Sequence, residues 1–356
     1  KVVMALHHKV LPPTIKVEEP AEAIRNSPVF YLNTEARPWI SDPARPRRGA
    51  VSSFGFGGSN FHVTLEEYTG KAAVRPWRTL PSELFLVSAN SPESLAAALD
   101  HLGKDDPTLS FAGRASQTHA AFRVSDKARA SIVAESQQDL AAKAAAIADA
   151  IRKHEVGKRP LKSGCSVSRD VTRPGKIAFM FSGQGSQYVG MGADLAMAFP
   201  SARAAWDEAA GHERTGALAL HRLAFPPAAF DQVEHGDQIE RLTLMQHAQP
   251  AIAAVALSHL ALLGEAGIEG SMAAGHSFGE IMALHYGGAL SSKAALTVAA
   301  ERGALMAEAA QSTSGSMIAV QAGAADISGI VSKFAPDLVL ANDNGPSQVV
   351  LSGPTG

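Results

Sequence analysis

The stretch Gly275-His276-Ser277-Phe278-Gly279-Glu280 contains a serine with a glycine two positions away on either side. The small and apolar residues 271–274 before it predict a strand, and residues 280–286 after it predict a helix. A strand that turns sharply into a helix around a serine is a nucleophile elbow, where any Cβ at the glycine positions would meet the crossing backbone. The turn would lift the Ser277 hydroxyl above the sheet and place the Phe278 amide at a helix N-terminus, facing an oxyanion. An ordinary surface turn is the alternative interpretation.

The composition is that of an ordinary globular protein. The chain has 356 residues, a net charge of −2 and 46% hydrophobic residues. This length allows two or three domains with sizeable cores, and the balanced charge argues against nucleic acid as the main partner. The longest apolar run, residues 251–263, is shorter than the about 18 residues of a membrane span, so we expect a buried helix and no membrane contact. No secretory signal is recognisable, which favours a cytoplasmic location.

The chain has a single cysteine, Cys165, which excludes an internal disulfide and a cysteine-based metal site. We expect no metal. Polar residues surround Cys165 in a predicted loop, where neither a strand nor an apolar wall would support a catalytic cysteine.

Three regions follow one another along the chain: residues 1–68, 69–172 and 173–356. The chain starts inside a helical pattern and stops inside a strand pattern, so we expect a piece of a longer protein.

The first region contains a predicted short strand at residues 30–33 and a glycine-rich turn between strands at residues 53–60. Between them lie Arg37, Arg45, Arg47 and Arg48, interleaved with prolines. This arginine-rich segment predicts a solvated loop, with contact to a phosphate of a carrier or coenzyme as the alternative.

The second region is alanine-rich, with predicted strands at 83–87, 122–124 and 130–134 and predicted helices at 91–102 and 138–154. Ser91 is the expected N-cap of the first helix. The third region predicts a strand at 176–181, a loop at 182–187, and helices at 194–199, 202–210 and 291–309. It ends in a β-α-β-β pattern at 317–320, 326–334, 338–342 and 348–351.

Several motifs of the third region occur in the order of the acyltransferase of fatty-acid and polyketide synthases, which this region resembles. They are Gln184 in its glycine-flanked loop, Ala248-Gln249-Pro250-Ala251, the elbow, Arg302-Gly303, and Ala341-Asn342-Asp343-Asn344 with Gln348–Gly353. Residues 1–68 resemble the end of a ketosynthase, and residues 69–172 resemble the ketosynthase–acyltransferase linker. The sequence of residues 32–39 is similar to that of iterative synthases of the polyunsaturated-fatty-acid or enediyne type.

The resemblance implies an α/β fold. Its acyltransferase core would be α/β-hydrolase-like (residues 173–311) and would carry a partial ferredoxin-like small subdomain (residues 312–356). An α/β linker domain and a thiolase-like ketosynthase tail would precede this core.

The resemblance also assigns roles to residues. Ser277 would be the nucleophile, and the backbone amides of Gln184 and Phe278 would form the oxyanion hole. Arg302 would clamp a substrate carboxylate through a bidentate fork, with a solvated pair beside Glu301 as the alternative.

Gln249 would line the acyl pocket, or would merely begin a helix before Pro250. His276, Asn342 and Asn344 complete the substrate-binding set, and packing of the elbow or a role in turns are their alternatives.

Phe56, Gly57 and Gly58 resemble the gate and oxyanion turn of the ketosynthase. The cysteine and two histidines of that enzyme would lie upstream of Lys1, so we do not expect condensation by this chain alone. The resemblance places the general-base histidine of the acyltransferase beyond Gly356, and we expect His247 and His285 to be packed or surface residues.

The function implied is transfer of a malonyl group from malonyl-CoA, through a serine ester, to the phosphopantetheine thiol of an acyl carrier protein. No bound cofactor is expected. The remaining partners would be the upstream ketosynthase and the rest of the synthase, with a homodimer formed through the ketosynthase. The alternatives are a serine hydrolase or editing thioesterase, and a docking fragment without activity.

Overall fold

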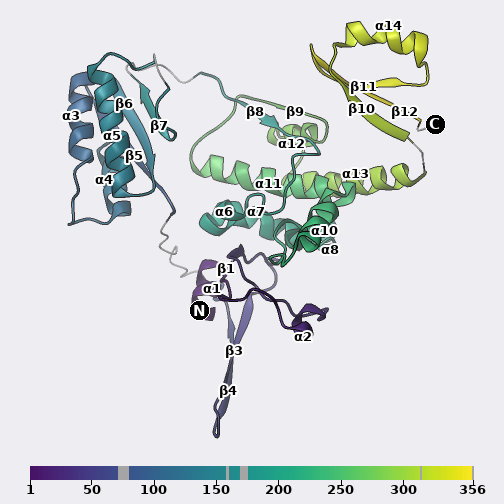
Figure 1. Cartoon of the computed structure of the whole chain (residues 1–356), viewed down its shortest axis with the longest axis horizontal. Coiled ribbons are helices and arrows are strands. Elements are labelled where there is room, and N and C mark those ends of the chain that lie inside the picture. The colour runs from purple at the N-terminus through teal and green to yellow at the C-terminus, as the bar shows by residue number, and fades with distance from the viewer. Residues whose placement is uncertain (71–79, 158–159, 169–174, 313–314, 355–356) are drawn as a thin grey trace. The chain divides into compact units, whose positions relative to one another are not determined.

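The computed structural model describes residues 1–70, 80–157, 160–168, 175–312 and 315–354. The chain divides into two compact units, one formed by residues 1–74 with 176–356 and the other by residues 75–175 (Figure 1). Both borders of the predicted linker, residues 69 and 172, fall beside or within segments outside the described residues.

The unit of residues 75–175 has a three-stranded antiparallel sheet with the strand order β5-β6-β7. Its elements are β5 (Glu83–Ala89), α3 (Pro92–Leu102), α4 (Phe111–Ala121), β6 (Ala128–Ala134), α5 (Gln137–Arg152) and β7 (Cys165–Ser168). Every second residue of β6 is buried, as expected for a strand with one face on a core. Against that face pack Phe85, Leu95, Leu99, Leu140 and Ile147, which form a core of their own for this unit.

The helix starts of this unit follow the sequence closely. Ser91, Ser110 and Ser136 each accept a hydrogen bond from the backbone amide three residues later, which satisfies a free donor of the first helical turn. The prediction of a strand at 122–124 is wrong, because the chain leaves α4 there and finds no strand to pair with. Cys165 is not in a loop, since it pairs with Ile132 at the start of β7.

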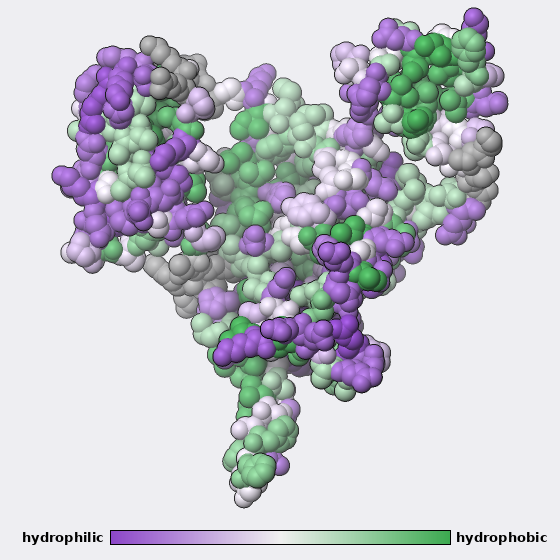
Figure 2. Space-filling view, in the orientation of Figure 1, coloured by the Kyte–Doolittle hydropathy of each residue, from purple (hydrophilic) through white to green (hydrophobic). Residues whose placement is uncertain are grey.

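The N-terminal residues contribute α1 (Val2–His8), β1 (Val10–Leu11), α2 (Glu22–Arg25), β2 (Arg37–Pro38), β3 (Arg48–Phe54) and β4 (Asn60–Glu66). The predicted strand at 30–33 is wrong, and β1 pairs instead with β2. The strands β3 and β4 form the predicted hairpin around the glycine-rich turn. Figure 2 shows hydrophobic side chains along this hairpin, and Phe54, Phe56 and Phe61 are all exposed.

The arginine-rich segment is only partly solvated, which corrects the prediction. Arg45 and Arg48 are exposed, whereas Arg37 and Arg47 are buried. Arg37 Nη1 donates to the carbonyl of Phe225 at 2.7 Å, and Arg47 Nη2 lies 2.6 Å from an oxygen of Asp207. These two arginines are buried because acceptors satisfy their guanidinium groups, as burial of a charge requires.

The third region is built around two parallel strands, β8 (Ala178–Phe181) and β9 (Met272–Gly275), paired from Ala178↔Met272 to Phe181↔Gly275. Its helices are α6 (Ala193–Ala198), α7 (Pro200–Gly211), α8 (Glu213–Ala217), α9 (Leu220–Ala224), α10 (Gln232–Thr243), α11 (Met245–Glu265), α12 (Gly279–Tyr286) and α13 (Ser292–Ser312). Helix α11 packs against both α7 and α13. The core between these helices includes Trp206, Leu242, Phe278, Met282 and Leu296.

Helix α11 is longer than the predicted 251–263, because it begins at Met245 and continues through Pro250. By length and composition alone its 21 residues would suffice to cross a membrane, a test that core helices of soluble proteins also pass. The stretch from Ala248 to Ala254 is buried in the core, which is typical of such a core helix.

The C-terminal residues form a small antiparallel sheet of β10 (Gly315–Val320), β11 (Val339–Gly345) and β12 (Gln348–Pro354), in the order β10-β12-β11. Helix α14 (Ala324–Phe334) follows β10 (Figure 1). This is the predicted β-α-β-β pattern, with each boundary within three residues.

Candidate active site

The turn between β9 and α12 has the geometry of a nucleophile elbow. Ser277 has a φ of 52° in the left-handed region and is exposed, whereas Gly279 opens α12 two residues later. A non-glycine residue held in this region costs about 1–3 kcal/mol, so the surrounding structure must impose it. The strained conformation presents the serine side chain at the C-terminal end of β9, as the sequence predicts.

The two glycines of the motif are required by close backbone approaches. A Cβ on Gly275 would overlap the carbonyl of Gly279 across the turn, and a Cβ on Gly279 would overlap the carbonyl of Phe181 in β8. The His276 amide donates to that same Phe181 carbonyl at 3.0 Å, which fixes the turn on the sheet. The elbow is therefore held between both strands and tolerates no side chain at either position.

Two backbone amides near Ser277 are free to donate. Within the described part of the chain, neither the Phe278 amide at the start of α12 nor the Gln184 amide after β8 donates to a protein acceptor. The ring of Phe278 is fully buried in the core, so its backbone is fixed at the helix N-terminus. Uncommitted amides beside a nucleophile are the arrangement that stabilises an oxyanion.

The Gln184 loop lies directly against the elbow. A Cβ on Gly183 would come within 2.5 Å of the His276 carbonyl oxygen and 3.1 Å of its Nδ1 atom, so only glycine fits there. The loop is closed by Ser186, whose hydroxyl donates to the Gly183 carbonyl at 2.8 Å. The side chain of His276 reaches β11, where Nε2 lies 3.0 Å from Oδ1 of Asn344.

Arg302 is half-buried on α13 and points to α11. Its Nη1 donates to Oε1 of Gln249 at 2.7 Å, and Gln249 is fully buried. The Nε2 atom of Gln249 lies 3.2 Å from Oε1 of Gln184 and 3.3 Å from the sulfur of Met306. The structure thus connects three residues that the sequence predicted separately, and adds Met306, for which the sequence carried no signal. Arg302 and Met306 also line an apolar hollow along α13 of about 450 Å³.

Other candidates lie apart from this group. Asn342 is half-buried in β11, next to a register shift, and within the described residues no hydrogen bond links its side chain to the elbow. Phe56, Gly57 and Gly58 form the exposed tip of the β3–β4 hairpin.

His247 and His285 each have one ring nitrogen close to a backbone carbonyl. His247 Nδ1 lies 2.7 Å from the Arg241 carbonyl, and His285 Nδ1 lies 2.9 Å from the Leu290 carbonyl. Among the described residues, no histidine is hydrogen-bonded to the Ser277 hydroxyl. Burial raises the pKa of the Cys165 thiol, which is the opposite of what a nucleophilic cysteine needs.

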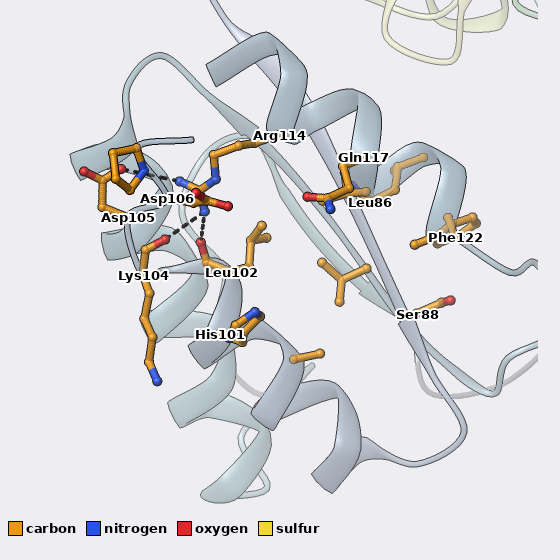
Figure 3. A pocket seen from close by; sticks show the side chains of 15 residues that line it. Leu86, Ser88, His101, Leu102, Lys104, Asp105, Asp106, Arg114, Gln117 and Phe122 are labelled. Atoms are coloured by element: carbon orange, nitrogen blue, oxygen red, sulfur yellow. Dashed lines mark hydrogen bonds and ion pairs between the residues drawn. The ribbon is translucent and has the colours of Figure 1, made fainter. Parts of the chain in front are cut away.

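A cavity of about 590 Å³ lies in the other unit, between α3, α4 and β5. Figure 3 shows Arg114 at its edge, with hydrogen bonds to the carbonyls of Leu102 and Lys104 at 2.7 and 2.8 Å. These bonds close the turn after α3, so the guanidinium is committed to the fold rather than offered to a ligand. The elbow is the better candidate, because its amides and hydroxyl remain uncommitted.

The strand, turn and helix around Ser277, with two free amides beside it, define a protein of the nucleophile-elbow class. Residues 178–356 match the acyl transferase domain family, and residues 20–133 match the ketoacyl-synthetase C-terminal extension. The chain therefore belongs to the acyl transferase domain family. This agrees with the resemblance found in the sequence.

Curated relatives of the chain are large synthases. It is 29% identical over 99% of its length to a polyunsaturated fatty acid synthase protein of Thraustochytrium sp. (strain ATCC 26185 / S-3), of which it spans 13%. It is 33% identical over its whole length to spectinabilin polyketide synthase system protein NorB of Streptomyces orinoci, of which it spans 16%.

Solved structures with the same fold are acyltransferase domains. The acyl transferase domain of ZmaA has a TM-score of 0.64 at 24% identity, over 78% of this chain and 60% of that one. The acyltransferase domain from module 8 of the salinomycin polyketide synthase has a TM-score of 0.55 at 26% identity, over 78% and 62%. The mixed α/β fold of the acyltransferase is thus shared with these domains.

Proposed function

We propose that Ser277 accepts a malonyl group from malonyl-CoA and passes it to the phosphopantetheine thiol of an acyl carrier protein. In the first step the serine oxygen forms a bond to the thioester carbon, and the carbon–sulfur bond breaks as coenzyme A leaves. The serine proton passes through a general base to the departing sulfur. The carrier thiol then attacks the serine ester, and the serine recovers its proton.

The observation that carries this proposal is the elbow itself. An exposed serine in a left-handed conformation stands beside two free amides, those of Phe278 and Gln184. Loss of one such donor costs about 10²–10³ in rate in enzymes of this kind, so two fixed amides supply much of the required stabilisation.

The half-buried guanidinium of Arg302 supports a substrate with a free carboxylate. One of its nitrogens is held by Gln249, which leaves its remaining donors for a ligand. A planar fork of donors binds a carboxylate through two parallel hydrogen bonds. A malonyl group has such a carboxylate, and an acetyl group does not. A serine hydrolase or editing thioesterase would not need this clamp.

In the part of the chain that the structure describes, no histidine is hydrogen-bonded to the Ser277 hydroxyl, so none of His247, His276 and His285 is identified as the general base. We place it at a histidine downstream of Gly356, as the family resemblance implies. We propose that the protein acts within a fatty-acid or polyketide synthase, next to a ketosynthase to which Phe56, Gly57 and Gly58 belong, with no bound cofactor.

The test is the mass of the full-length protein carrying this sequence after it is mixed with malonyl-CoA, with digestion to locate the adduct. We expect one malonyl group on the peptide that contains Ser277, removed by addition of acyl carrier protein. A Ser277→Ala variant should form no adduct. An adduct that survives this substitution, or one that water removes as fast as the carrier does, would contradict the proposed transfer.

A further inference from the structure

The fully buried side-chain amide of Gln249 is hydrogen-bonded to both Arg302 and Gln184. It therefore links the arginine of the proposed carboxylate clamp to the loop of the proposed oxyanion hole. Gln249 comes from α11, Arg302 from α13 and Gln184 from the loop after β8. The contact therefore connects three segments that are distant in the sequence.

The orientation of this amide is fixed by its partners. Arginine has no acceptor, so the Gln249 oxygen must face Arg302, at 2.7 Å from Nη1. The Gln249 nitrogen then faces Gln184 Oε1 at 3.2 Å and the Met306 sulfur at 3.3 Å. Both of its N–H donors and its oxygen have partners, so rotation of the amide would break each of these contacts at once.

Burial makes this orientation strongly preferred. A buried polar group that loses its hydrogen-bond partner is left with the full free-energy cost of its removal from water. Gln249 is fully buried, so water cannot replace a lost partner. The hydrogen bond from Gln249 consequently fixes the Gln184 side chain, while the Gln184 backbone amide stays free to donate beside the elbow.

The geometry points to Gln249 as a positioning residue that holds the arginine clamp and the oxyanion loop in one hydrogen-bonded unit. This inference rests on the proposed function and goes beyond it, because it gives one residue two separable effects. Through Arg302, Gln249 would affect only substrates with a carboxylate. Through Gln184, it would affect every acyl group, because each forms an oxyanion.

The experiment compares malonyl-CoA with acetyl-CoA, which lacks the carboxylate. Single-turnover acylation of Ser277 is followed by quenched-flow mass measurement of the full-length protein, for wild type, Gln249→Met and Arg302→Ala. Methionine keeps nearly the volume of glutamine and removes its hydrogen bonds. Ser258→Ala is the matched control, since Ser258 is also fully buried on α11 and lies outside the site.

We expect Arg302→Ala to slow malonyl transfer much more than acetyl transfer, since it removes the clamp directly and affects the loop only through Gln249. We expect Gln249→Met to slow both, with the maximal acetyl rate lowered about ten-fold or more and the half-saturating acetyl-CoA concentration unchanged. Losing an oxyanion donor outright costs about 10²–10³, which sets the upper limit. Ser258→Ala should retain both rates.

If Gln249→Met slows malonyl transfer alone, Gln249 serves only the clamp and the inference is overturned. Wild type that acylates neither substrate would instead overturn the proposed function. Should Gln249→Met fail to fold, Gln184→Met removes the same hydrogen bond from the loop and keeps the backbone amide. It should then lower the acetyl rate in the same way, and an unchanged acetyl rate in that variant overturns the inference.

Discussion

The contact between α11 and α13 makes Gly303→Ala a sharp test of the packing that supports the site. A Cβ on Gly303 would lie 2.6 Å from the Met245 carbonyl oxygen and 3.0 Å from the Cα atom of Gln246. Both are backbone atoms, which cannot rotate away as a side chain can. Gly236, inside α10, is the matched control, because nothing lies within 4 Å of a Cβ built there.

The expected size of the effect follows from two opposing contributions. Alanine stabilises a helix interior by about 1 kcal/mol relative to glycine, and both variants gain this free energy. Relief of the overlap at Gly303 requires α13 to move away from α11, and overpacking of this kind costs about 1–3 kcal/mol. Because the helix propensity cancels, Gly303→Ala should be less stable than Gly236→Ala by about 1–3 kcal/mol.

Hydrogen exchange of the two variants, followed by mass spectrometry on peptides from α11 and α13, measures this difference locally. We expect faster exchange in both helices for Gly303→Ala, and exchange at the wild-type rate or slower for Gly236→Ala. If amides in α11 and α13 exchange as slowly in Gly303→Ala as in Gly236→Ala, the two helices are not held at backbone contact. The placement of Arg302 beside Gln249 then loses its support.

Two further predictions concern pH and helix capping. Burial, with repulsion from Arg222 and Arg37, lowers the pKa of His221 to about 4, so the unfolded chain takes up a proton at higher pH than the folded one. The free energy of unfolding should fall by about 2 kcal/mol from pH 7 to pH 5 because of this group. In urea titrations of His221→Gln, this part of the pH dependence should be absent. A pH dependence unchanged by the substitution would refute the assignment. In the other unit, Ser91→Ala and Ser136→Ala should each lower the free energy of unfolding by about 1 kcal/mol, because each removes an N-cap acceptor. Thermal melts in which neither variant is destabilised would show that these caps contribute nothing.

Features that depend on neighbours in the sequence could be predicted. The elbow needs two glycines placed around Ser277, and the cap at Ser91 needs a serine three residues before the amide that it accepts from. The β-α-β-β pattern at the C-terminus also follows from local periodicity. At Gly275 and at the Ser91 cap the interacting groups lie within one turn, so the spacing of residue types contains the information.

Features that depend on distant partners could not be predicted. Arg47 pairs with Asp207, and Arg37 donates to Phe225, so each partner lies more than 150 positions away. A run of arginines and prolines carries no sign of such acceptors, and it therefore suggested a solvated loop. The apolar triplet Phe30–Leu32 and the alternating Phe122-Arg123-Val124 suggested strands for a similar reason, since a strand exists only where another strand pairs with it.

The glycines show most clearly which structural requirements the sequence alone does not reveal. Gly183, Gly279 and Gly303 have no unusual backbone angle among the described glycines, and each is required because another segment's backbone passes within contact distance. Gly57 and Gly185 have positive φ and open space around the missing Cβ, so conformation rather than contact explains them. The sequence shows the same letter in all five places. At the elbow, the flanking serine, strand and helix revealed the reason for Gly275, because the backbone that approaches it, at Gly279, belongs to the same turn. At Gly303 the approaching backbone belongs to α11, and the requirement appears only when two distant helices are packed together.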